Sequence, residues 1–80
     1  MQRRYVVAVD VGGTTIKSAL VTADGEQLSP ARRATARELG TESVVCAILD
    51  ATSAAVSSGS AQCGQPPLAI GVACLGAVDE

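Results

Sequence analysis

The 80-residue chain has no histidine, tryptophan or phenylalanine, and Tyr5 is its one aromatic residue. Without histidine, acid–base catalysis by an imidazole is excluded within these residues. The three cysteines, Cys46, Cys63 and Cys74, are widely spaced and form no Cys-x-x-Cys pair. We therefore expect neither a zinc site nor a disulfide framework, but three reduced thiols in a cytoplasmic protein.

The chain also lacks a long apolar run and an excess of charge of either sign. Asp10 interrupts the first apolar run after five residues, which is too short for a secretion signal or a membrane span. The net charge is −2 without a basic stripe, so the sequence does not support nucleic-acid binding. Arg32, Arg33 and Arg37 form a short basic cluster, which we interpret as the solvated edge of a strand.

What the chain does contain predicts a small soluble α/β domain. Apolar residues make up 48% of it, most of them alanine and valine. Apolar and β-branched segments predict four strands, with a helix between the third and the fourth. The expected strands cover residues 5–9, 16–22, 26–34 and 68–73, and the last is predicted to be buried and parallel to the first because a helix separates them.

Turn signals and periodicity add detail to this β-β-β-α-β order. Asp24-Gly25 predicts a hairpin, and Pro30 indicates an edge strand or a bulge. The helix is expected to begin at a Thr41 or Ser43 cap and to stop at Gly59, before a loop over residues 57–67. One face of this helix collects the apolar side chains expected to cover the sheet: Val44, Val45, Ile48, Leu49, Ala55 and Val56. Within this scheme Cys46 packs inside and Cys63 lies in an exposed loop.

The most informative stretch is Asp10-Val-Gly-Gly-Thr-Thr-Ile-Lys17, which joins the first two strands. Glycines allow backbone N–H groups to approach phosphate oxygens, and they supply the positive φ angles that tight turns need. Thr14 and Thr15 add hydroxyl donors, and Lys17 adds a positive charge. Asp10 would repel a bare phosphate, so its natural partner is a hydrated Mg²⁺ bound to that phosphate.

Two common phosphate motifs are excluded for this stretch. The Walker pattern needs glycine immediately before Lys-Ser and a helix afterwards, but here Ile16 precedes Lys17 and a strand follows. The dinucleotide fingerprint needs a third glycine and a helix, and both are missing. The residue types alone leave two interpretations open, a phosphate site or a plain hairpin in which Asp10 caps the turn.

The stretch from Asp10 to Lys17 resembles the first phosphate motif of the ROK family of sugar kinases, open reading frames and repressors. The resemblance continues in order through Asp24-Gly25, the strand at residues 68–73 and the segment 76–79. It implies the N-terminal portion of an actin-like ATPase (ribonuclease H-like) fold, with residues 1–80 forming a single, incomplete domain. Since no segment for a DNA-binding helix-turn-helix precedes the motif, the kinase branch is the expected one.

The resemblance implies ATP and Mg²⁺ as cofactors and transfer of the γ-phosphate to a hexose such as glucose. Mg²⁺ would be held through water by Asp10, and the phosphates would be bound by Gly12, Gly13, Thr14, Thr15 and Lys17. Gly76 matches a sugar-contacting backbone position, although Leu75 replaces the usual proline. No catalytic residue falls within this chain, because the family's catalytic aspartate lies later. The partners implied are a sugar and ATP, with a possible homo-oligomer, and neither nucleic acid nor membrane.

Two alternatives to a kinase segment remain open. One is a regulatory, non-catalytic ROK protein that binds a sugar and responds to it. The other is a truncated product without activity of its own, since the chain stops where the sugar site begins.

Overall fold

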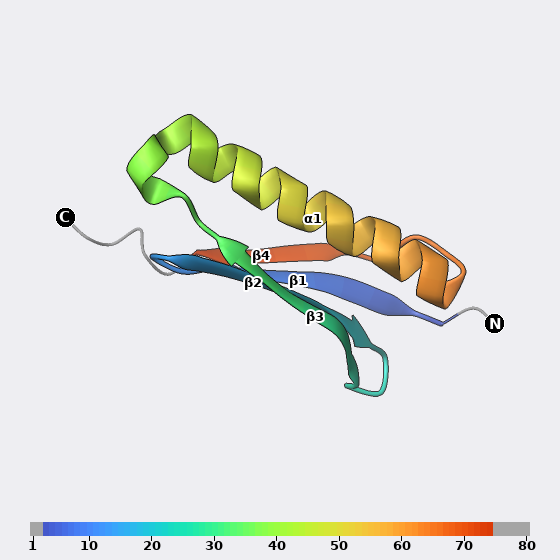
Figure 1. Ribbon diagram of the computed structural model, residues 1–80. Helices are drawn as coiled ribbons and strands as arrows, with labels where there is room; N and C mark the ends of the chain where they lie inside the picture. Colours follow the sequence, from blue (N-terminus) through green and yellow to red (C-terminus); the bar gives the residue numbers. More distant parts are fainter. Residues whose placement is uncertain (1–2, 75–80) are drawn as a thin grey trace.

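Four strands form one mixed sheet in the order β3-β2-β1-β4, and one long helix covers one of its faces (Figure 1). The computed structural model describes residues 3–74. The elements are β1 (Tyr5–Val11), β2 (Thr15–Thr22), β3 (Gln27–Ala34), a 3₁₀ turn η1 (Arg37–Leu39), α1 (Thr41–Cys63) and β4 (Ile70–Cys74). The chain is thus α/β, and the predicted β-β-β-α-β order is confirmed.

Strand direction follows from the connections. The hairpins make β1 antiparallel to β2 and β2 antiparallel to β3, whereas β4 returns through α1 and pairs with β1 in parallel. The turn between β2 and β3 is the predicted one, with Gly25 at φ 90° and its N–H bonded to the carbonyl oxygen of Thr22. As Pro30 indicated, β3 is an edge strand, and its pairing with β2 is interrupted by a register shift.

Alternation along β1 separates the two faces of the sheet. Tyr5, Val7, Val9 and Val11 are buried under α1, while the residues between them face the opposite, open side. In β2, Ile16 and Leu20 complete the buried layer.

The helix contacts this layer through small residues rather than through large apolar ones. Ala51, Ala55, Gly59 and Cys63 recur every four residues along its buried stripe. A Cβ atom at Gly59 would lie 2.4 Å from Cε2 of the Tyr5 ring, so only glycine lets the helix approach this closely. The Tyr5 hydroxyl donates to the carbonyl oxygen of Gln65 at 2.9 Å, which fixes the ring against the helix.

Several details of the predicted helix were wrong. It continues past Gly59 to Cys63, and Gly64 in the left-handed conformation ends it. Its N-cap is Gly40, without a side-chain cap, instead of Thr41 or Ser43.

The two helical cysteines exchange their predicted environments. Cys63 is buried in the last turn, whereas Cys46 is exposed. Val45 and Leu49, assigned to the buried face, are 48% and 61% exposed. The reason is that the small-residue stripe turns toward the sheet, which leaves these larger side chains beside it.

Strand β4 is exposed along its whole length, contrary to the prediction of a buried strand. Ile70 and Val72 lie in register with Val7 and Val9 on the helix side of the sheet, yet they are 48% and 53% exposed. The helix packs mainly against β1 and β2 and only weakly, if at all, against β4, so it does not cover this edge.

Candidate functional site

The turn between β1 and β2 is closed by a single backbone hydrogen bond, from the N–H of Gly12 to the carbonyl oxygen of Thr15 at 2.9 Å. Contrary to the prediction, neither Gly12 nor Gly13 has a positive φ angle. Glycine at position 12 is instead favoured by close packing, because a Cβ atom there would lie 3.1 Å from the Thr15 carbonyl oxygen. The loop is therefore narrow, and a ligand could approach the backbone of its glycines closely, because they carry no side chains.

The donors of this loop are not all available. The Gly12 N–H is used in the turn, whereas the N–H groups of Gly13 and Thr14 donate to no other group within residues 3–74. Both residues are exposed. The hydroxyls of Thr14 and Thr15 lie 3.5 Å apart. Two adjacent N–H groups without a partner, next to two hydroxyls, are donors of the kind that bind an anion.

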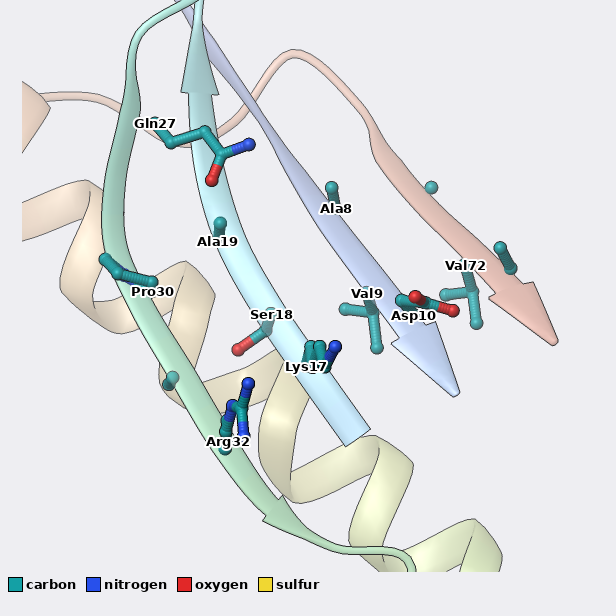
Figure 2. A pocket seen from close by; sticks show the side chains of 13 residues that line it. Ala8, Val9, Asp10, Lys17, Ser18, Ala19, Gln27, Pro30, Arg32 and Val72 are labelled. Carbon is teal, nitrogen blue, oxygen red and sulfur yellow. The ribbon is translucent and has the colours of Figure 1, made fainter. Parts of the chain in front are cut away.

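A row of charges crosses the open face of the sheet near this turn. Asp10 of β1 lies in register with Lys17 of β2, which lies in register with Arg32 of β3 (Figure 2). All three side chains are exposed, and no ion pair joins any of them within the described residues. They line a hollow of about 850 Å³, whose floor also carries small side chains such as Ala8 and Ala19.

The residues predicted from sequence to form one site are divided between two hollows, and Thr14 and Thr15 line neither of them. Asp10 and Lys17 line the large one on the open face. Gly12 and Gly13 line a second hollow of about 180 Å³. It lies at the edge where the parallel strands β1 and β4 both end, which is where open α/β sheets bind ligands.

Sequence reasoning missed Thr35, which holds the glycine loop in place. Its hydroxyl donates to the carbonyl oxygen of Gly12 at 3.1 Å, and its N–H donates to the carbonyl oxygen of Thr14 at 3.0 Å. The residue is 1% exposed, so both of its polar groups depend on the loop. No local pattern marks it, because its partners lie more than 20 residues earlier in the chain.

The basic cluster predicted from sequence, Arg32, Arg33 and Arg37, does not form one patch in the structure. The three arginines are exposed, as expected, but they point to different places. Arg32 lies in register with Lys17 of β2 on the open face, and Arg33 lies in register with Ile16 of β2 on the helix side. Arg37 belongs to η1 and lines the small hollow together with Gly13.

Gly76, the predicted sugar-contacting residue, lies outside the described residues. Among residues 3–74, no group of three or more acidic or cysteine side chains is placed to hold a metal ion. Asp10 is thus a single carboxylate, which is sufficient only for a metal that takes its other ligands from water and phosphate.

No protein-family model matches this chain, and no curated protein sequence is significantly similar to it. Among the described residues, α1 is long and apolar enough to cross a membrane by length and composition alone. In this structure it packs lengthwise on the sheet and buries Ala51, Ala55 and Cys63 there, while most of its other residues are exposed or half-buried.

Proposed function

We propose that this chain is the phosphate-binding segment of a ROK-type sugar kinase with an actin-like ATPase fold. In that role it binds the phosphates of Mg-ATP, and the complete enzyme transfers the γ-phosphate to a hexose such as glucose. A cytoplasmic location belongs to the same proposal. So does self-association, for which the exposed strand β4 is a suitable edge.

One observation carries the proposal: the loop at Gly12 and Gly13 lines a hollow where the parallel strands β1 and β4 end, and the N–H of Gly13 has no partner within the described residues. Asp10 is the next-to-last residue of β1, so it lies next to the same turn in the chain, and its side chain lines the hollow on the open face. The N–H groups of the two central residues are free in any tight hairpin turn, but a plain hairpin does not need the clamp that Thr35 provides. This combination favours the phosphate interpretation over the hairpin interpretation.

The donor set fits a hydrated Mg²⁺ at Asp10. Mg²⁺ keeps several waters and is commonly bound by one or two carboxylates together with substrate phosphates. When bound, the metal would neutralise phosphate charge. Asp10 would orient it through water, the N–H groups of Gly13 and Thr14 would bind phosphate oxygens, and Lys17 would offset the remaining charge. The Gly12 N–H is committed to the turn, so the role of this residue is to shape the loop.

Phosphoryl transfer also needs an acceptor hydroxyl and a base held in line with the donor. No residue of this chain is assigned as that base, since Asp10 serves the metal. We therefore expect the isolated chain to bind Mg-ATP without phosphorylating glucose.

Binding and turnover of the purified chain test the proposal together. Calorimetric titration with Mg-ATP should show binding, and Asp10→Ala should weaken it by about 10–100-fold, as for other residues that orient a metal through its outer shell. Asp24→Ala, in the distal hairpin, is the matched control and should leave the affinity unchanged. Failure of the folded wild-type chain to bind Mg-ATP would overturn the proposal. Glucose phosphorylation abolished by Asp10→Ala would show that catalytic residues have been misassigned.

A further inference from the structure

The small hollow beside the glycine loop contains a cation that the phosphate motif does not include. A Cβ atom built on Gly13 would lie 3.6 Å from Nη1 of Arg37, so the guanidinium group lies directly over the loop backbone. Both residues line the hollow of about 180 Å³. The turn from β1 to β2 and the turn before α1 therefore meet at one place.

The guanidinium of Arg37 is unpaired in the part of the chain that the structure describes. The one ion pair found within residues 3–74 joins Arg3 to Glu26, and the Arg37 side chain donates no hydrogen bond there. A guanidinium carries five N–H donors in a planar fork that matches the oxygens of a phosphate group. An unpaired fork beside Gly13, whose N–H also has no partner within the described residues, is a set of donors without an acceptor.

The backbone before Arg37 is held in an unusual conformation. Thr35 is bonded to the loop at both its hydroxyl and its N–H. The next residue, Ala36, is left-handed with φ 65°, which is uncommon for a residue other than glycine. The N–H of Leu39 then donates to the carbonyl oxygen of Ala36 at 3.0 Å and closes the η1 turn. This sharp change of direction, anchored on the loop, is what brings Arg37 over Gly13.

Lys17 cannot replace Arg37 at this position. Lys17 lines the large hollow on the open face, together with Asp10 and Arg32, and not the small one. A phosphate that occupies the small hollow therefore has Arg37 as its nearest cation among the described lining residues.

We propose that Arg37 is a phosphate-binding residue that grips the terminal group of a polyphosphate tail lying on the glycine loop. The ligand class is an inorganic polyphosphate or the triphosphate tail of a nucleotide, in which oxygens accept from the guanidinium fork and from the N–H groups of Gly13 and Thr14. This inference rests on the proposed function, because it adds a residue to the same phosphate site. No covalent step is involved.

Calorimetric titration of the 80-residue chain with inorganic tripolyphosphate and Mg²⁺ tests this inference. Arg37→Met should weaken binding about tenfold or more, since a hydrogen-bonded charge is lost. Arg37→Lys keeps the charge but loses the fork, and should give an intermediate affinity. Arg33→Met removes the same charge from a neighbouring exposed site, and should change the affinity by less than about threefold at physiological salt.

The outcomes separate this inference from the proposed function. Wild-type binding that Asp10→Ala weakens and Arg37→Met does not would overturn the role of Arg37 and leave the phosphate site intact. Equal losses for Arg37→Met and Arg33→Met would overturn it as well, because net charge alone would then explain binding. A folded wild-type chain that does not bind would overturn the phosphate site itself. If Arg37→Met perturbs folding, Arg37→Lys against Arg33→Lys makes the same comparison at constant charge.

Discussion

Strands β1 and β4 are parallel neighbours of similar apolar character, yet one is buried and the other is exposed. Four of the seven residues of β1 are buried, whereas none of the five in β4 is. The registered pair Val7 and Ile70 shows the contrast, with exposed fractions of 0% and 48%. Because both side chains are on the helix side of the sheet, the difference comes from the position of α1 and not from the residue type.

The largest expected effect comes from equal truncations on the two strands. Val7→Ala should lower the free energy of unfolding by about 2–3 kcal/mol, since it removes two buried methyl groups and leaves a cavity. Val72→Ala should change it by less than about 0.5 kcal/mol, because its side chain is already half in water. Urea unfolding of both variants gives the comparison. Similar losses would mean that β4 is covered in solution.

Glycine replacements sharpen the same comparison with a smaller expected effect. Gly59→Ala places a methyl group against the fixed Tyr5 ring and should destabilise the protein by about 1–2 kcal/mol, despite the better helix propensity of alanine. Gly71→Ala in β4 meets nothing within 4 Å and should be neutral or stabilising by up to about 1 kcal/mol. The denaturation midpoint of Gly59→Ala should therefore fall, whereas that of Gly71→Ala should stay unchanged or rise. A Gly59→Ala protein as stable as the wild type would show that α1 sits farther from the sheet.

The smallest effect is expected at the exposed hairpin between β2 and β3, away from both strands. The hydrogen bond from the Thr22 hydroxyl, and then those from backbone N–H groups, hold the pKa of Asp24 below its ordinary value of 3.8. A lowered folded-state pKa means that this stabilisation is present above about pH 4, and is lost as the pH falls through the folded-state value. Unfolding curves between pH 2 and pH 7 should show a smaller acid loss for Asp24→Asn than for wild type. An identical pH dependence would contradict the role of Asp24.

Local signals in the sequence were sufficient for the order and the direction of the elements. A continuous apolar, β-branched segment predicted β1, Asp24-Gly25 predicted the second hairpin, and Pro30 indicated an edge strand. These features depend on neighbours within a few residues, so a single sequence contains them. The fold class follows in the same way, because a helix between the third and fourth strands makes a parallel return to β1 the natural connection.

Burial on the helix could not be deduced in the same way. The larger apolar residues Val45 and Leu49 were expected to face the sheet, but the small residues at 51, 55, 59 and 63 do so. Their small side chains let the helix lie close to the sheet, and at Gly59 the neighbour is the Tyr5 ring, which lies more than 40 positions away in the sequence. The environments of Cys46 and Cys63 were reversed for the same reason.

For the candidate site, the sequence by itself determined the residues of the β1–β2 turn. Asp10, the two glycines and Lys17 lie within one stretch of eight residues, and their residue types are suited to a phosphate site. Only the tertiary structure decided how they are distributed. Alternation in β1 and β2 sends Asp10 and Lys17 to the open face, and the fold brings Thr35 and Arg37 to the glycines. Contacts across 20 or more residues depend on the path of the whole chain. The left-handed conformation of Ala36, which directs Arg37 toward the glycines, could not be predicted from the sequence, because alanine does not favour that conformation.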